Sequence, residues 1–256
     1  MELYLKERIE QQGVAVGAFL QDLRQPLVVQ LLAAAEMDFF IIDTEHGVFD
    51  NESVADLIRM GRLAGVIPLV RVIAPAYEWL CPRLDAGARG LIVPRIGDAQ
   101  TVRQAVRCTK YPPVGVRGAV SLKGQTDYRL VDTPSFLAEQ NRHHFVIPQI
   151  ELQAALDHLD EILQVEGIDI VLVGPFDLSI ALGSPGRIDD PREVDQIQRV
   201  IDRCIHHGKI PGIAVGTIAA SKFWIERGMR FVVCGSDVGL LRGGFNQITA
   251  ELKGSR

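Results

Sequence analysis

The chain has 256 residues, of which 47% are hydrophobic and 23% are charged, and its formal net charge is −5. This size and composition predict a single large α/β domain spanning residues 1–256. No dense block of lysine and arginine occurs, which argues against a nucleic-acid partner. The amino-terminal segment lacks the basic-then-apolar order of a signal peptide, and no apolar run reaches the length of a membrane span. We therefore expect a cytoplasmic protein without a membrane partner.

The cysteines are far apart in the sequence and form no CxxC pair. This spacing suggests neither a zinc site nor a disulfide framework, so we expect reduced, buried thiols. The four residues are Cys81, Cys108, Cys204 and Cys234.

Apolar, largely β-branched runs alternate with helical segments along the whole chain. The predicted strands are 14–20, 39–43, 68–72, 90–94, 145–151, 169–177 (with its polar end), 211–215 and 231–234. The predicted helices are 26–36, one capped by Asn51 or Ser53 and ending near 64, 76–84, 98–108, 134–141, 154–163, 191–207, 217–227 and 238–252.

This alternation predicts parallel strands and a closed (β/α)8 barrel, that is, a TIM barrel with an additional C-terminal helix. A doubly wound open sheet is the alternative fold. It would normally carry a glycine-rich turn after an early strand, whereas the first strand here ends in Phe19-Leu20-Gln21-Asp22.

Polar residues gather after four of the predicted strands. In a barrel, functional groups lie at the C-terminal ends of the strands and in the loops that follow them. The residues at these positions are Asp43, Glu45, His46, Arg71, Gln149, Glu151 and Asp177. Neighbouring strands bring Glu151 and Asp177 to the same rim, where two carboxylates repel each other unless a proton or a cation lies between them. We interpret these two acids as ligands of a divalent metal ion.

Each of these residues also has a purely structural interpretation. Asp43 could cap a loop, His46 could be a surface histidine, and Arg71 could be an ion-pair partner. Glu151 could be the acid that starts the next helix, and Asp177 could be an N-cap. Together these explanations require five independent coincidences at one end of the barrel, so we favour a functional site.

Four motifs in the same order resemble the HpcH/HpaI aldolase family over nearly the whole chain. These are Asp43-Thr-Glu-His-Gly47, Tyr111-Pro-Pro-Val-Gly-Val-Arg-Gly118, Gln149-Ile-Glu151 and Gly174-Pro-Phe-Asp-Leu-Ser179. The family comprises class II, metal-dependent pyruvate aldolases such as 4-hydroxy-2-oxoheptanedioate aldolase and 2-dehydro-3-deoxyglucarate aldolase. The resemblance implies reversible retro-aldol cleavage of a 4-hydroxy-2-oxo acid to pyruvate and a short aldehyde, through a metal-stabilised pyruvate enolate.

The resemblance also implies catalytic roles. His46 would be the catalytic base, Asp85 would raise its basicity, and Arg71 would stabilise the enolate.

The binding roles follow in the same way. Glu151 and Asp177 would hold the metal, and Gln149 with the backbone around Phe176 and Asp177 would hold pyruvate. Oxygen ligands suit Mg²⁺ or Mn²⁺, with Co²⁺ as a further candidate.

Three positions depart from the family pattern, namely Thr44, Leu152 and Phe176. The last two border the predicted site, so they bear on the size and polarity of the substrate rather than on the chemistry. The resemblance further implies a homo-oligomer, commonly a hexamer with exchanged helices. The identity of the aldehyde stays open, as does the role of loop 111–133 as a lid or a subunit contact.

Rival functions remain. A lysine Schiff base would need a lysine at the barrel mouth, and no predicted strand ends in one. A citrate- or malyl-CoA-type lyase would need basic groups for CoA near the mouth, where no basic cluster is evident. The non-catalytic alternative is a barrel that only binds a small acid, and such a protein would not need His46.

Overall fold

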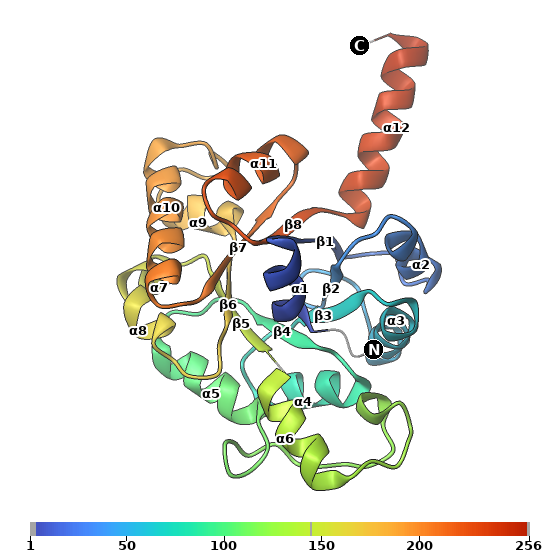
Figure 1. Ribbon diagram of the computed structural model, residues 1–256. Helices are drawn as coiled ribbons and strands as arrows, with labels where there is room; N and C mark the ends of the chain where they lie inside the picture. Colours follow the sequence, from blue (N-terminus) through green and yellow to red (C-terminus); the bar gives the residue numbers. More distant parts are fainter. Residues whose placement is uncertain (1–3, 144, 255–256) are drawn as a thin grey trace.

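The computed structural model describes residues 4–143 and 145–254, and Figure 1 shows its chain. Eight strands pair in chain order and close into a barrel, as predicted. Every strand pair is parallel, and the register places Asp43 of β2 beside Arg71 of β3. The strands are β1 (Ala15–Leu20), β2 (Phe39–Asp43), β3 (Ile67–Arg71), β4 (Gly90–Val93), β5 (Phe145–Ile150), β6 (Ile170–Val173), β7 (Ile210–Val215) and β8 (Phe231–Ser236).

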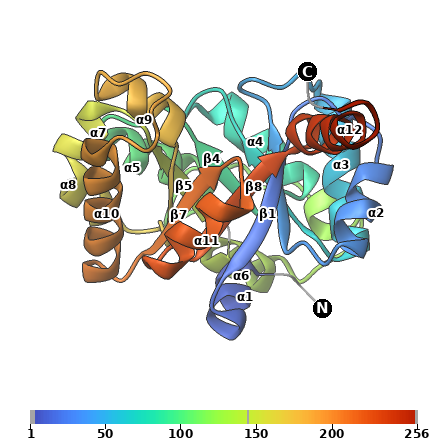
Figure 2. The same ribbon diagram turned by 90° about the horizontal axis from the view of Figure 1, so that it is seen from above.

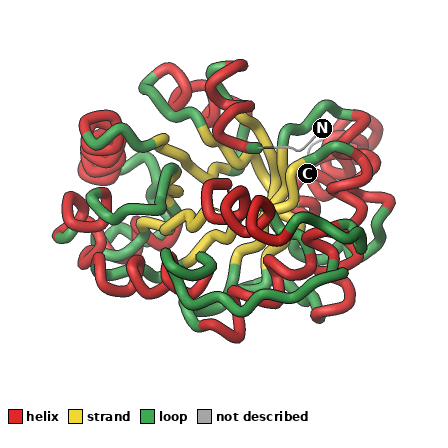
Figure 3. The backbone as a smooth tube through the Cα atoms, turned by 60° about the horizontal axis from the view of Figure 1, so that its bottom comes forward, coloured by secondary structure: helices red, strands yellow, loops and turns green. Residues whose placement is uncertain are grey.

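Helices surround the strands, with loops joining the two layers (Figure 3). They are α1 (Leu5–Gln12), α2 (Leu27–Ala34), α3 (Asn51–Ala64), α4 (Tyr77–Ala86), α5 (Ala99–Thr109), the short 3-10 helix η1 (Gly124–Thr126), α6 (Thr133–His143), α7 (Gln153–Asp157), α8 (Leu159–Leu163), α9 (Pro175–Ala181), α10 (Pro191–His206), α11 (Ile218–Glu226) and α12 (Asp237–Lys253).

The structure corrects four details of the predicted helices and their caps. The predicted helix 154–163 is divided into α7 and α8, and α9 occupies a segment that was expected to be strand end and loop. Asp50, rather than Asn51 or Ser53, caps α3, because its carboxylate accepts the Ser53 N–H. Since α9 already begins at Pro175, Asp177 lies in its first turn and is not an N-cap.

Side chains alternate between two apolar layers along each strand. In β2, Phe39 and Ile41 face the barrel interior, whereas Phe40 and Ile42 belong to the layer between strands and helices. Leu5 of α1 joins the interior cluster. Helix α1 therefore closes the end of the barrel where the strands begin, which leaves the opposite end for a binding site.

Within residues 4–143 and 145–254, no helix is both long enough and apolar enough to cross a membrane.

Helix α12 leaves the ring of helices and projects away from the barrel between α11 and α2 (Figures 1 and 2). Asp237 at its start is its buried residue. Leu241, Phe245 and Ile248 are exposed on the projecting part, as is Leu252. A helix of a globular protein usually buries its apolar face against another element, and among the described residues the projecting part of α12 has no such partner for this face.

The long loop 111–132 packs against α4. Arg117 is fully buried and donates from Nη2 to Asp85 Oδ1 over 2.7 Å, while its guanidinium lies 4.6 Å from the centre of the Tyr111 ring. The Gly118 N–H donates to the Tyr77 hydroxyl over 2.9 Å. The loop is thus held to both ends of α4.

The first turn of α10 carries a buried acid whose charge is not balanced. Glu193 is 0% exposed, and in the described chain neither carboxylate oxygen has a hydrogen-bond partner. Burial, with a smaller effect of Asp190 and Asp189, raises the pKa of Glu193 to about 7. Because the folded state binds this proton more tightly than the unfolded state does, the contribution of Glu193 to stability is lost as the pH rises through about 7.

The substitution Glu193→Gln removes the free-energy cost of burying an ionised carboxylate. We expect the variant to exceed the parent protein in free energy of unfolding by about 2 kcal/mol at about pH 8, with the difference disappearing towards about pH 4.5. Urea denaturation at several pH values measures it. Glu226→Gln, a change at an exposed acid, should leave the pH profile unaltered. A parent protein more stable than Glu193→Gln at about pH 8 would contradict this account.

Candidate functional site

The open end of the barrel contains a buried ion pair between adjacent strand ends. Arg71 Nε and Nη2 donate to the two oxygens of Asp43 over 2.9 and 2.6 Å. Burial opposes both charges, but the pairing outweighs it, lowering the pKa of Asp43 and raising the pKa of Arg71. Both residues are therefore charged, and a guanidinium with five N–H groups keeps further donors for another acceptor.

The segment after β2 turns tightly around Asp43. Asp43 Oδ1 also accepts the N–H groups of Glu45 and His46, over 3.1 and 3.3 Å. Any Cβ at Gly47 would lie 2.2 Å from the Asp43 carbonyl oxygen, so this turn requires glycine. Thr44 fits here because its N–H and hydroxyl both donate to the Arg71 carbonyl.

The turn places Glu45 and His46 side by side at the rim. Glu45 Oε2 lies 3.4 Å from Arg71 Nη1 and 3.9 Å from His46 Nε2. This oxygen is buried and has no hydrogen-bond partner in the described chain. The His46 side chain is 62% exposed, so it remains accessible to a molecule entering the mouth.

The ends of β5 and β6 form the second part of the site. Glu151 Oε1 accepts the Arg95 N–H over 2.6 Å, and Gln149 Nε2 donates to Glu151 Oε2. A Cβ at Gly174 would lie 2.9 Å from Gln149 Nε2 and from Glu151 Oε2, so glycine is needed for β6 to approach them. Gln149 Oε1 is buried and has no partner in the described chain.

Three carboxylates converge on this mouth. Burial raises the pKa of Glu151, and nearby Glu45 and Asp177 add to the effect. Burial likewise raises the pKa of Glu45, with Asp43 and Asp177 contributing in the same direction. A divalent cation would relieve this repulsion, so the residues fit the predicted metal. Among the residues the structure describes, no group of three or more His, Cys, Asp or Glu side chains is placed to hold a metal ion by itself.

Six of the seven predicted site residues lie at the open end, and Asp85 does not. The six are His46, Arg71, Gln149, Glu151, Phe176 and Asp177, and the Phe176 side chain is 65% exposed. Asp85 lies in the last turn of α4, which runs from the rim back towards the closed end of the barrel, and it pairs with Arg117. The described chain therefore gives no geometric support for the predicted contact between Asp85 and His46.

Two contributions to the site were not assigned from the sequence. The sequence identified Glu45 only as a polar residue near a strand end. Its place next to His46 in the Asp43–Gly47 motif could have marked it as a further site residue. The Arg95 N–H that binds Glu151 depends on a positive φ of 55° at Arg95, for which the sequence gives no signal.

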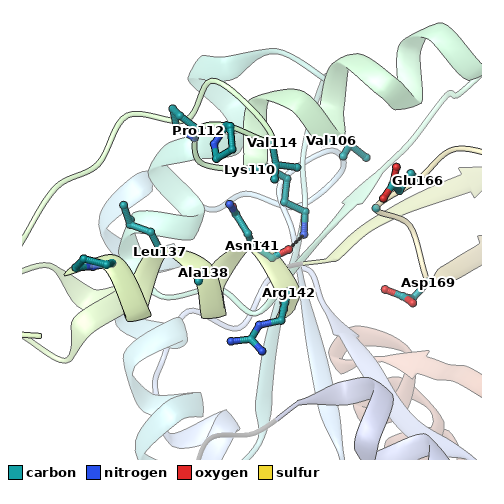
Figure 4. A pocket seen from close by; sticks show the side chains of 13 residues that line it. Val106, Lys110, Pro112, Val114, Leu137, Ala138, Asn141, Arg142, Glu166 and Asp169 are labelled. Atoms are coloured by element: carbon teal, nitrogen blue, oxygen red, sulfur yellow. Dashed lines mark hydrogen bonds between the residues drawn. The ribbon is translucent and has the colours of Figure 1, made fainter. Parts of the chain in front are cut away.

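A larger cavity of about 1000 Å³ lies away from the mouth, between α5, α6 and the segment before β6 (Figure 4). Lys110 Nζ in its wall donates to the Asn141 carbonyl over 2.6 Å. Burial lowers the pKa of Lys110 to about 8, a property of lysines that form Schiff bases. However, Lys110 follows α5 at the end of the barrel where the strands begin, so this cavity gives no support to a Schiff-base mechanism at the acidic mouth.

A closed parallel barrel with its polar groups gathered where the strands end defines the class of (β/α)8-barrel enzymes. The HpcH/HpaI aldolase/citrate lyase family matches residues 16–243. This chain belongs to that family.

Named relatives and a solved structure agree with this assignment. A 5-keto-4-deoxy-D-glucarate aldolase of Salmonella arizonae is 30% identical, over 97% of this chain and 96% of its own. A hydroxypyruvate/pyruvate aldolase of Agrobacterium fabrum is 33% identical, over 93% of this chain and 89% of its own. The crystal structure of an HpcH/HpaI aldolase from Desulfitobacterium hafniense is 31% identical, with a TM-score of 0.94 over 100% of this chain and 98% of that one.

Removing one of the predicted metal ligands should weaken cation binding. We expect Glu151→Gln and Asp177→Asn each to lower the affinity for Mn²⁺ by roughly 100-fold or more, because a carboxylate ligand is lost. Titration calorimetry with Mn²⁺ alone measures this. Glu166→Gln, at an exposed acid in the other cavity, should bind Mn²⁺ like the parent protein. Equal affinity in all four proteins would remove Glu151 and Asp177 as ligands.

Proposed function

We propose that this protein is a class II aldolase that cleaves a 4-hydroxy-2-oxo acid to pyruvate and a short aldehyde, and that catalyses the reverse condensation. As a member of its family it is a carbon–carbon lyase. The observation that carries the proposal is the convergence of Glu45, Glu151 and Asp177 beside the Asp43–Arg71 pair at the open mouth. Nothing in this acidic mouth favours a CoA ester, which would need basic groups.

Glu151 and Asp177 would hold a divalent cation, with Mg²⁺ and Mn²⁺ as the leading candidates. When bound, such a cation supplies Lewis-acid stabilisation for the negative charge that develops on the 2-oxo group. Gln149 is oriented by its bond to Glu151, and its second amide hydrogen would donate to the acid end of the substrate. Its unpaired oxygen would accept a hydrogen bond from a hydroxyl group or a water molecule.

Arg71 and His46 would carry out the charge and proton steps. His46 removes the proton of the 4-hydroxyl, the bond between C3 and C4 breaks, and the aldehyde leaves. The electron pair passes to the pyruvate fragment, and the free N–H groups of Arg71 stabilise the resulting enolate oxygen. Protonation at C3 then gives pyruvate. The contact of Glu45 with both residues fits a role in orienting His46 beside Arg71.

The reaction is tested by following pyruvate release from 4-hydroxy-2-oxo acids with a coupled lactate dehydrogenase assay. We expect EDTA to abolish release, and His46→Ala to lower kcat by about 10²- to 10⁴-fold because a general base is lost. His158→Ala, which changes another exposed histidine, serves as the matched control and should keep the parent rate. Release that continues in EDTA would exclude the metal-dependent mechanism, and full turnover by His46→Ala would exclude His46 as the base.

We also propose that the protein is a homo-oligomer, with a hexamer as the expected form, in which α12 of each copy packs on a partner. The proposal rests on the apolar residues that α12 exposes and on its projection from the ring of helices (Figure 1). Exposed Leu27 and Leu31 on neighbouring α2 offer an apolar surface of the same kind.

Charge placed on that face of α12 should break the assembly. We expect Leu241→Glu combined with Phe245→Glu to produce monomers, because two carboxylates would be desolvated in the contact. Light scattering after size exclusion measures the mass. Gln247→Glu, on the same helix, is the control and should keep the oligomer. An unchanged mass for the double variant would show that α12 does not form the interface.

A further inference from the structure

The cavity of about 1000 Å³ between α5, α6 and the segment before β6 has no part in the proposed aldol chemistry (Figure 4). Apolar side chains line much of it, among them Val106, Pro112 and Leu137. Lys110 also lines it, although this residue is only 4% exposed. Such a position calls for an explanation, because lysines are rarely buried and an ammonium ion is costly to remove from water.

Lys110 is held at a fixed place in the cavity wall. Its Nζ donates to the Asn141 carbonyl over 2.6 Å, and Figure 4 shows the side chain reaching from the end of α5 towards Asn141. Its backbone N–H donates to the Val106 carbonyl over 3.2 Å, and its own carbonyl accepts the Arg117 N–H over 2.9 Å. The amine is therefore positioned by the fold and does not move freely in solvent as the amine of a surface lysine does.

The surroundings of Lys110 favour the neutral amine. Burial lowers the pKa of Lys110 to about 8, and the charge of Arg117 acts in the same direction. Asp169 opposes this effect, but its carboxylate already pairs with Lys6 Nζ over 2.8 Å. At about pH 7.5 roughly one quarter of the amine is then neutral, against about one in a thousand for a lysine with the ordinary pKa of about 10.4. Desolvation of this kind makes a lysine nucleophilic.

The cavity can admit a small molecule to this amine. Its volume of about 1000 Å³ is sufficient for one, and Pro134 and Ala138, which line it, are exposed to solvent. When Lys110 is neutral, the charged side chains of the described lining are Arg142, Glu166 and Asp169. Two acids and one base favour an uncharged molecule over an anion.

We propose that Lys110 is a covalent modification site for short, uncharged aldehydes, which enter this cavity and condense with the amine to form an imine. The nitrogen lone pair attacks the carbonyl carbon, and a proton passes from the nitrogen to the oxygen. Loss of water from this carbinolamine leaves the C=N bond, and addition of water reverses the step. The site does not depend on the proposed aldolase function, because it lies at the other end of the barrel and needs no metal.

Reductive trapping tests the site directly. The full-length protein is incubated with glycolaldehyde, sodium cyanoborohydride and EDTA at about pH 7.5, and the adduct on each lysine is quantified by peptide mass spectrometry. We expect at least about tenfold more adduct at Lys110 than at Lys222, an exposed lysine of α11, because burial increases the neutral fraction of Lys110. Equal or weaker labelling at Lys110 would overturn the proposal.

The pH dependence of labelling gives a second measurement. The adduct at Lys110 should increase with pH and level off above about pH 8. Labelling of free Nα-acetyl-lysine in the same mixture should continue to increase towards about pH 10.4. A Lys110 profile parallel to that of the free amino acid would contradict the proposal.

Filling the cavity tests the route to the amine. Ala138→Trp adds a large side chain to the lining, and we expect it to lower labelling of Lys110 by about tenfold because the space is occupied. Ser135→Trp, at an exposed position of the same helix outside this lining, is the matched control and should keep the parent labelling. Parent-level labelling in Ala138→Trp would show that the aldehyde does not reach Lys110 through this cavity. Pyruvate release from 4-hydroxy-2-oxo acids is measured separately without cyanoborohydride, so failure of one proposal leaves the other standing.

Discussion

The bidentate ion pair between Asp43 and Arg71 is the interaction on which the rest of the site depends. The parallel register of β2 and β3 places the two residues side by side, and the closed barrel buries them. Breaking such a pair would leave an uncompensated charge in the interior, a loss of about 3–5 kcal/mol. The same carboxylate shapes the turn that holds Glu45 and His46, and it accepts the Gln21 amide. One ion pair therefore connects the strand register, the turn that carries the proposed base, and Gln21 at the end of β1.

The remaining acids explain why the site suits a cation. Asp43 and Arg71 neutralise each other, so Glu45, Glu151 and Asp177 add negative charge that the described side chains balance only in part. Burial and mutual repulsion raise the pKa of Glu151 and Glu45, which means that the folded chain disfavours their ionised forms. A divalent cation would supply the positive charge that balances these carboxylates. The chain's own electrostatics thus favour a bound cation, in a member of the HpcH/HpaI aldolase/citrate lyase family.

The sequence predicted the barrel and most of its rim because both follow from local patterns. Strands that alternate with helices must pair in parallel, and eight such units close into a barrel. A residue at the C-terminal end of a strand therefore lies at the rim of the barrel, whatever the rest of the chain does. Asp85 was assigned by resemblance alone, and the direction of α4 carries it away from His46. The departure of α12 from the ring could not be predicted, because its apolar pattern is the same whether it packs on its own barrel or on a partner. The position of the buried Glu45 oxygen beside Arg71 depends on the pairing of β2 with β3, which no local sequence pattern predicts.

The cavity beside Arg71, at the ends of β1, β7 and β8, could not be predicted from the sequence either, because it exists where several glycines have no side chain to fill the space. Gly216, Gly235 and Gly239 leave open the space that side chains would fill at the ends of β7 and β8. Their position completes an arrangement around one rim. Strands β2, β3, β5 and β6 carry or adjoin the charged residues of the site. The ends of β7, β8 and β1 carry small and apolar residues beside one buried acid, Asp237, whose carboxylate accepts the N–H groups of Gln21, Asp22 and Leu23. The contact of Phe19 with Arg71 lies at the boundary between them.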